Sequence, residues 1–255
     1  MWMWGNLWES YVNNDLRDVE LDDITKYHVT KFIQTVPTYH SIYLRGSFLE
    51  RNIVGSCTGS LSTSEHSDID FVVVVPEKTD VQMSMYGKGF KYKINRVPCD
   101  VKVIDYNRFS KYPNNLFLEV LPLKMVEGEE DLSIRKIDLH EIQHDYHDKY
   151  KALRNQLDNP QCKGRVRDAY TAKKYIKKLL RNCFDTVGPE LGMHTRSLDY
   201  CQYFFCEVHP EHEVLITKLL DVFLNTNRYA WDYIQKLVSE SEILIDFIGN
   251  YGRPV

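Results

Sequence analysis

A short acidic motif is the clearest candidate for catalytic or metal-binding chemistry in this sequence. Asp68 and Asp70 are separated by one residue, and residues 71–75 that follow them are continuously apolar. Side chains at positions i and i+2 of a β-strand point to the same face of a sheet. The spacing therefore predicts two carboxylates side by side at the mouth of a buried strand, which is costly unless a cation lies between them.

A third carboxylate, Asp100, lies in residues 98–104, where the alternation of side chains predicts another strand. If this strand neighbours the first, the three acids form an oxygen ligand set of the kind that Mg²⁺ prefers. Two such ions about 3.5–4 Å apart suit in-line phosphoryl or nucleotidyl transfer. We therefore expect Asp68, Asp70 and Asp100 to surround one or two divalent ions.

A glycine–serine pair supplies the second half of the predicted site. Gly46 and Ser47 directly follow residues 42–45, which form a short predicted strand. Glycine lets the backbone approach a phosphate closely, and the serine hydroxyl and following amides can hold phosphate oxygens. The pair therefore predicts a small anion-binding corner at a strand end, and Arg45 beside it is a further candidate for binding the nucleotide.

In this order, the features resemble the DNA polymerase β-type nucleotidyltransferase superfamily. The match is carried by YLRGSFL at residues 43–49 and by SDIDFVV at residues 67–73, with Asp100 as the later strand carboxylate. The chain length and the C-terminal helices are similar to those of aminoglycoside nucleotidyltransferases and their minimal relatives. The motif match covers about residues 40–105, and over the helical half the resemblance is architectural only.

The resemblance implies a role for each motif residue. Asp68 and Asp70 would be metal ligands and catalytic residues. Asp100 would be a third ligand, or the base that activates the acceptor hydroxyl. Gly46 and Ser47 would contact the β- and γ-phosphates of a nucleoside triphosphate.

One departure from the family pattern leaves an alternative open. The spacer between Ser47 and Asp68 has twenty residues, twice the usual length. The pair Gly55-Ser56 stands eleven residues before Asp68 and fits the spacing better. Residues 51–54 in front of that pair are only a weak strand candidate, so we favour Gly46 and Ser47 with an inserted loop.

Charge is unevenly distributed along a chain whose net charge is −4 and whose pI is about 6.1. Residues 119–148 carry nine acidic and three basic side chains, whereas residues 163–181 carry eight basic side chains and one acid. The acidic average argues against a nucleic-acid footprint over the whole surface. The asymmetry can serve two differently charged partners, and two solvated helix faces are the simpler interpretation.

The basic segment has the periodicity of an amphipathic helix. One face would carry Lys173, Lys174, Lys177, Lys178 and Arg181, and the buried face Ala172, Tyr175, Ile176, Leu179, Leu180 and Cys183. This pattern is explained by an ordinary helix packed on a core. In addition, we expect Lys174 and Lys178 to reach the triphosphate.

Residues 140–144, HEIQH, match the HExxH signature of zinc proteases. On a helix this spacing puts both histidines on one face, with the glutamate able to act as a base. The surrounding segment is polar all round, however, and no third ligand stands out in the sequence. We therefore favour a solvent-exposed helix start or an interdomain linker.

The order of elements predicts an α+β fold. A helix over residues 22–37, with Ile24, Tyr27, Phe32, Ile33 and Val36 as its apolar stripe, and strands near residues 41–45, 69–75, 90–95 and 97–105 predict a mixed sheet with flanking helices. A helical bundle follows, with helices over residues 139–158, 163–186, 197–207, 210–225 and 228–248. We expect a nucleotidyltransferase catalytic domain at residues 1–137 and a helical acceptor-binding domain at residues 138–255.

Composition bounds the class of protein. The chain has 255 residues, of which 43% are apolar and 27% charged, the balance of a soluble globular protein. No apolar run approaches the ~18 residues of a membrane helix, and the start does not have the pattern of a signal peptide. Six cysteines without regular spacing favour a reducing cytoplasm.

The expected function is Mg²⁺-dependent transfer of a nucleoside monophosphate, AMP from ATP in the simplest case, to a hydroxyl acceptor with release of pyrophosphate. The acidic segment favours a small polycationic acceptor such as an aminoglycoside, and hence antibiotic resistance. Alternatives are transfer to tRNA or to a protein hydroxyl, as in toxin–antitoxin systems. A non-catalytic relative that binds nucleotide or a partner protein is the alternative from another class.

Overall fold

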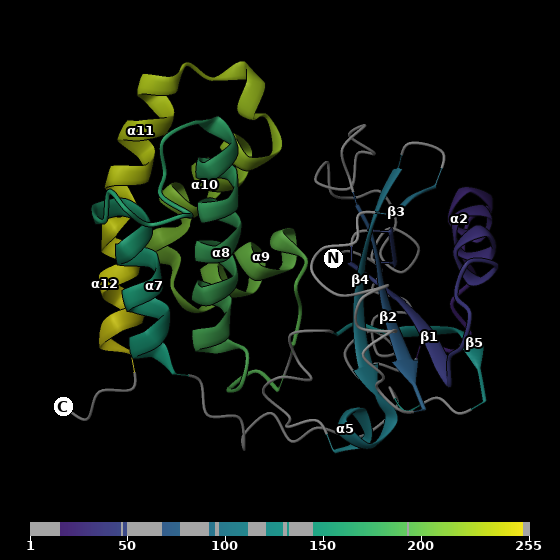
Figure 1. Cartoon of the computed structure of the whole chain (residues 1–255). Coiled ribbons are helices and arrows are strands. Elements are labelled where there is room, and N and C mark those ends of the chain that lie inside the picture. Colours follow the sequence, from purple (N-terminus) through teal and green to yellow (C-terminus); the bar gives the residue numbers. More distant parts are fainter. Residues whose placement is uncertain are drawn as a thin grey trace. The chain divides into compact units, whose positions relative to one another are not determined.

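The computed structural model describes residues 16–46, 48–49, 68–76, 92–94, 97–111, 121–129, 132, 145–192 and 194–251. The chain divides into two compact units, Met1–Asp138 and Leu139–Val255. The N-terminal unit contains a mixed sheet, and the described part of the C-terminal unit is helical (Figure 1). The predicted α+β class is therefore confirmed.

In the part of the N-terminal unit that the structure describes, the sheet has five strands in the order β3-β4-β2-β1-β5. Their bounds are Ser41–Arg45 (β1), Ile69–Val75 (β2), Tyr92–Ile94 (β3), Val97–Asp105 (β4) and Lys124–Gly128 (β5). β2 is central and pairs in parallel with β4, whereas its pairing with β1 is antiparallel. The strands β1, β2 and β4 match the predicted ones, β3 lies within the strand predicted at residues 90–95, and β5 was not predicted.

One face of the sheet is apolar and packs against helix α2 (Asp23–Ile33) (Figure 1). Alternate residues of the central strands form this face: Ile42 and Leu44 of β1, and Ile69, Phe71, Val73 and Val75 of β2. The rings of Phe32 and Phe71 stack at 3.9 Å between centroids. Because strand residues alternate between faces, the residues between them, Asp70 included, lie on the opposite face.

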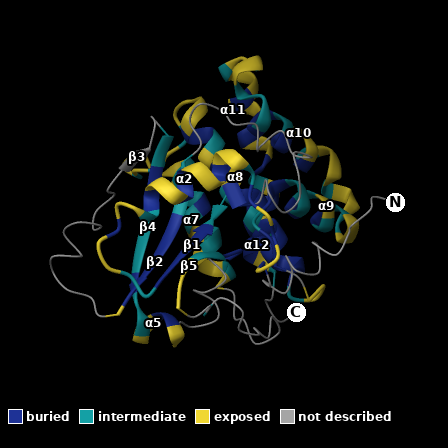
Figure 2. Ribbon diagram, turned by 90° about the vertical axis from the view of Figure 1, so that its right-hand side faces the viewer, coloured by how far each residue is buried: buried dark blue, intermediate teal, exposed yellow. Residues whose placement is uncertain are grey.

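The predicted apolar stripe of α2 was wrong in detail. The helix buries Thr25, His28, Val29 and Phe32, which follow the i, i+3, i+4, i+7 spacing. Ile24 and Tyr27 are instead 59% and 43% exposed, and Figure 2 shows the exposed side of α2 in yellow. The buried face includes polar Thr25 and His28, because the position of Phe32 over Phe71 fixes the rotation of the helix.

Helix α2 is also shorter than predicted. Its N-cap is Asp22, whose carboxylate accepts a hydrogen bond from the Thr25 backbone N–H at 2.7 Å. The helix ends at Ile33, so Val36 belongs to the turn that follows, where it is still buried.

The C-terminal unit contains six α-helices in its described part. They are α7 (Tyr146–Asp158), α8 (Ala169–Val187), α9 (Leu198–Val208), α10 (Glu213–Leu224), α11 (Trp231–Glu240) and α12 (Glu242–Asn250). All helices share one apolar core, to which α8 contributes more buried residues than any other element. The predicted breaks near Pro160, Gly188-Pro189 and Pro210 are confirmed.

Helix α8 is amphipathic, as predicted. Its first turn is fixed by a capping box in which the Asp168 carboxylate accepts from the Thr171 backbone N–H at 2.7 Å. The helix therefore begins at Ala169 rather than at residue 163. The six residues predicted for its apolar face, from Ala172 to Cys183, are all buried.

The predicted helix over residues 228–248 is in fact two helices, because the chain turns at Ser241. The buried Ser241 hydroxyl donates to the Val238 carbonyl at 2.6 Å. The Tyr175 hydroxyl of α8 lies 2.7 Å from the Ser241 hydroxyl oxygen. This contact between distant segments stabilises the break between α11 and α12. Among the described residues, no helix is long and apolar enough to span a membrane.

The rotation of α2 gives a matched pair of substitutions. Phe32→Ala removes a buried ring that stacks on Phe71 and is expected to lower the free energy of unfolding by about 3–5 kcal/mol. Ile24→Ala on the same helix changes an exposed side chain and should alter it by less than about 0.5 kcal/mol. Urea unfolding of both variants measures the difference, and equal losses would show that the assigned buried face is wrong.

Candidate active site

Three charged residues form a row across the middle of the sheet. Arg45 of β1 is paired with Asp70 of β2, and Asp70 is paired with Asp100 of β4. Paired residues of neighbouring strands point to the same face, and this face is the one opposite α2. The structure therefore brings Asp70 and Asp100 side by side, with Arg45 on the other side of Asp70.

Further along the strands, this face carries both apolar and polar side chains, the polar ones being Lys102 of β4 and Ser41 of β1, which pair with Val72 and Val74. Beyond the charged row, Val72 and Val74 of β2 and Ile104 of β4 follow on the same face, and all three are buried. The ring of Phe109, in helix α5 (Tyr106–Ser110), lies 5.6 Å from the Tyr43 ring. The acidic side chains on this face of the central strands, Asp70 and Asp100, therefore lie where β2 begins.

Gly46 joins the glycine–serine corner to the acidic pair. Its φ is +71°, in the left-handed region that favours glycine. A Cβ atom at this position would overlap the Asp70 Oδ2 oxygen and lie 3.1 Å from Asp70 Cγ. The bare Gly46 backbone therefore makes room for the Asp70 carboxylate, so two motifs that the sequence separates by more than twenty residues are in contact.

Asp68 lies immediately before β2 and is half-buried. Within the part of the chain that the structure describes, no three Asp, Glu, His or Cys side chains form a group able to hold a metal ion. The structure thus brings together Asp70 and Asp100 and does not gather Asp68 with them into a three-acid ligand set. The role of Asp68 stays a prediction.

The Asp70–Asp100 pair fits a divalent cation. Mg²⁺ is usually bound through one or two carboxylates, with phosphate oxygens and water completing six ligands. The two carboxylates here come from directly paired positions of adjacent strands, whose backbones are about 4.8 Å apart. Asp70 is half-buried and Asp100 exposed, and the space beside Asp70 is kept open by Gly46. Asp70 and Asp100 would hold the ion.

Lys174 and Lys178, the predicted triphosphate ligands, belong to the C-terminal unit. Lys174 is exposed, and its ammonium lies 4.2 Å from the centroid of the Tyr170 ring. Lys178 is half-buried, and this burial lowers the pKa of its ammonium group. Their predicted contact with the triphosphate is not tested by these positions.

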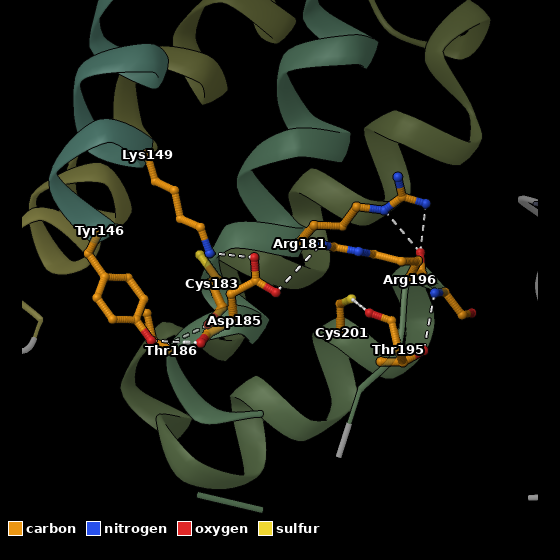
Figure 3. Close-up of polar contacts among 10 residues, drawn as sticks. Tyr146, Lys149, Arg181, Cys183, Asp185, Thr186, Thr195, Arg196 and Cys201 are labelled. Carbon is orange, nitrogen blue, oxygen red and sulfur yellow. Dashed lines mark hydrogen bonds and ion pairs between the residues drawn. The ribbon is translucent and has the colours of Figure 1, made fainter. Parts of the chain in front are cut away.

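The structure also contains a buried charged cluster that the sequence did not indicate. Asp185 of α8 is 3% exposed, and its two oxygens lie 2.6 Å from Lys149 Nζ and 3.4 Å from Arg196 Nη1 (Figure 3). The Tyr146 hydroxyl donates to the Asp185 carbonyl at 2.9 Å, and burial raises the pKa of Tyr146. No periodicity marks such a cluster, because its members come from α7, α8 and the segment before α9.

Several predicted features lie outside the described residues. They are Ser47, the alternative pair Gly55-Ser56, the HEIQH motif and most of the acidic segment at residues 119–148. The described part of helix α7 begins at Tyr146, and its N-cap is Asp145, which directly follows that motif.

Comparison with models of protein families and with curated proteins finds no match to this chain.

The contact between Gly46 and Asp70 can be measured by a double-mutant cycle. Gly46→Ala should lower the free energy of unfolding by more than the ~1–2 kcal/mol that a left-handed alanine costs, because the methyl group displaces the Asp70 carboxylate. In an Asp70→Ala background the additional loss should disappear, which gives a coupling energy of at least about 1 kcal/mol.

Gly192 is the matched control for this cycle, because its φ is +62° and no atom lies within 4 Å of a Cβ placed there. Gly192→Ala should therefore lower the free energy of unfolding only by the cost of a left-handed alanine, and by the same amount with or without Asp70. A coupling energy near zero between Gly46 and Asp70 would contradict the site geometry.

Proposed function

We propose that the chain is a Mg²⁺-dependent nucleotidyltransferase, which transfers a nucleoside monophosphate from ATP to a hydroxyl acceptor and releases pyrophosphate. The observation that supports this proposal best is the register pairing of Asp70 with Asp100, with the Gly46 backbone against Asp70. A carboxylate pair beside an open backbone corner can hold a metal–phosphate group. The mixed sheet with a parallel β2–β4 pair provides the rigid frame that such a site needs.

In the proposed reaction, Asp68 and Asp70 would hold Mg²⁺, and Asp100, which is paired with Asp70, would be a third ligand or the base that activates the acceptor hydroxyl. When bound, one or two Mg²⁺ ions would polarise the α-phosphoryl group and offset the charge on the leaving pyrophosphate. The Gly46 and Ser47 corner, with Arg45 beside it, holds the β- and γ-phosphates.

The proposed chemical step is an in-line displacement at the α-phosphorus of ATP. The acceptor hydroxyl loses its proton near Asp100, and its oxygen forms a bond to the α-phosphorus. The bond from that phosphorus to the bridging oxygen breaks, and pyrophosphate leaves with the electron pair. Asp100 acts here as a general base, a role that needs a carboxylate within reach of the hydroxyl.

For the acceptor, we propose a small polycation of the aminoglycoside type, supported by nine acids in residues 119–148. Such an activity would confer antibiotic resistance, in the cytoplasmic setting that the cysteine pattern predicts. Transfer to RNA is the second candidate, favoured by the basic residues on one face of α8. Binding that weakens steeply with added salt would favour RNA, because phosphate contacts release counterions.

The acidic pair gives the direct test of catalysis. Asp70→Asn and Asp100→Asn should each lower transfer of label from α-labelled ATP by more than about 100-fold, because both remove a metal-binding charge. The screen uses an aminoglycoside panel and total tRNA as acceptors, and circular dichroism checks the fold. Glu20→Gln, which changes an exposed acid outside the acidic segment of residues 119–148, should retain activity.

If Asp70→Asn transfers label as well as the unsubstituted chain does, the assignment of the site is wrong. If the unsubstituted chain labels neither acceptor class, titration of the chain with ATP, with and without Mg²⁺, distinguishes a non-catalytic nucleotide-binding protein from the proposed enzyme. A nucleotide-binding module would bind ATP equally with and without Mg²⁺, whereas the proposed site requires the ion.

Removal of the metal gives an independent prediction. EDTA should abolish label transfer, and excess Mg²⁺ should restore it, because the carboxylate pair alone repels a triphosphate. Far-ultraviolet circular dichroism should not change on chelation, since the sheet is held by its apolar face against α2. Full transfer activity in EDTA would exclude the proposed role of Asp70 and Asp100.

A further inference from the structure

Helix α8 carries a polar stripe that becomes progressively buried along its length. Lys174, Lys178, Asn182 and Asp185 follow one another at spacings of three or four residues, so they lie on one side of the helix. Lys174 is exposed, Lys178 half-buried, Asn182 7% exposed and Asp185 3% exposed. The apolar core occupies the other side, so hydrophobic burial does not explain why these positions are polar.

Asn182 is the unusual member of the stripe. Its Nδ2 atom is buried, and among the described residues it has no hydrogen-bond acceptor. A buried donor without a partner costs about 1–3 kcal/mol, and an apolar side chain of the same shape would avoid that cost. An asparagine at this position therefore indicates an acceptor that is not part of the described protein.

Lys178 lies one helical turn before Asn182 and is half-buried. Burial lowers the pKa of its ammonium group. Within the described ranges, no carboxylate lies within 4.0 Å of Lys178 Nζ. Side chains at positions i and i+4 of a helix have Cβ atoms about 6 Å apart, so one ligand with several oxygens can accept from both residues.

Asp185 does not supply those oxygens. Lys149 and Arg196 occupy its carboxylate from two sides (Figure 3). Arg181, the next base on α8, donates from Nε and Nη2 to the Arg196 carbonyl at 3.0 and 2.8 Å. The basic side chains around Asp185 outnumber the acid, so the surroundings favour an anion over a cation.

We propose that Lys178 and Asn182 form a binding site for a phosphate group in the helical unit. The site takes the oxyanion of a phosphate ester or polyphosphate, which accepts hydrogen bonds from the Lys178 ammonium and the Asn182 amide. The inference depends on α8 alone and does not require the transfer reaction. Its phosphate can come from the tail of ATP or from a phosphate-bearing acceptor.

The test is titration of the full chain with inorganic pyrophosphate in EDTA, so that no divalent ion contributes to binding. Lys178→Met and Asn182→Leu should each weaken binding about tenfold or more, the loss expected for one hydrogen bond to a charged group. Lys236→Met is the charge-matched control, because Lys236 is exposed on α11 and paired with Glu240. It should change the affinity by less than about twofold.

Thermal unfolding distinguishes a ligand-binding role of Asn182 from a structural one. If Asn182 lacks a protein partner, Asn182→Leu leaves the melting temperature unchanged or raises it, while pyrophosphate binding is lost. No binding by the unsubstituted chain, or equal affinity in Asn182→Leu, would overturn the proposal and leave Asn182 satisfied by water.

Two further measurements identify the source of the phosphate and separate this site from the sheet. If ATP displaces pyrophosphate in EDTA and the Asn182→Leu variant weakens ATP binding, the donor nucleotide occupies the site. If pyrophosphate binds and ATP does not compete, a phosphate-bearing acceptor occupies it. Asp70→Asn should leave metal-free pyrophosphate binding intact, so loss of transfer and loss of this site are distinguishable.

Discussion

Burial of the central strand β2 is the constraint on which the N-terminal unit depends. The strand has neighbours on both edges, and one of its faces is covered by α2. Six of its seven residues, all except Asp70, are completely or almost completely buried. A charged residue is tolerated only where the strand begins, and Asp70 stands there. The parallel register with β4 then places Asp100 beside it, so one pairing fixes both the core and the candidate site.

Local patterns predicted the elements of this site but not their contacts. The apolar run of β2 and the alternation of β4 are visible in the sequence, because period and composition are local properties. That Asp70 pairs with Asp100, and that Gly46 packs on Asp70, depends on strand order and register, which residues far apart determine. The sequence could therefore name the residues of the pair without establishing the distance between them.

The errors in the sequence-based prediction also arise from contacts between distant residues. Ile24 was predicted to be buried by its type, but the stacking of Phe32 on Phe71 rotates the helix so that Ile24 is exposed. The break at Ser241 depends on the Tyr175 hydroxyl from another helix, and no glycine or proline marks it. By contrast, the two faces of α8 were predicted correctly, because a strongly amphipathic helix carries its own orientation.

The polar residues of the two units favour ligands of opposite charge. These residues indicate function more directly than the apolar cores that stabilise each unit. On the sheet, Asp70 and Asp100 are paired across β2 and β4, and the proposed cation would bind to both carboxylates. On α8, an ammonium and a buried amide donor lack an acceptor among the described residues, and a bound oxyanion would satisfy both. Selection for stability alone would replace the buried Asn182 amide by an apolar group of similar shape. The two proposals therefore concern separate ligand sites, one within each unit, and each accounts for polar residues that the packing of that unit does not explain.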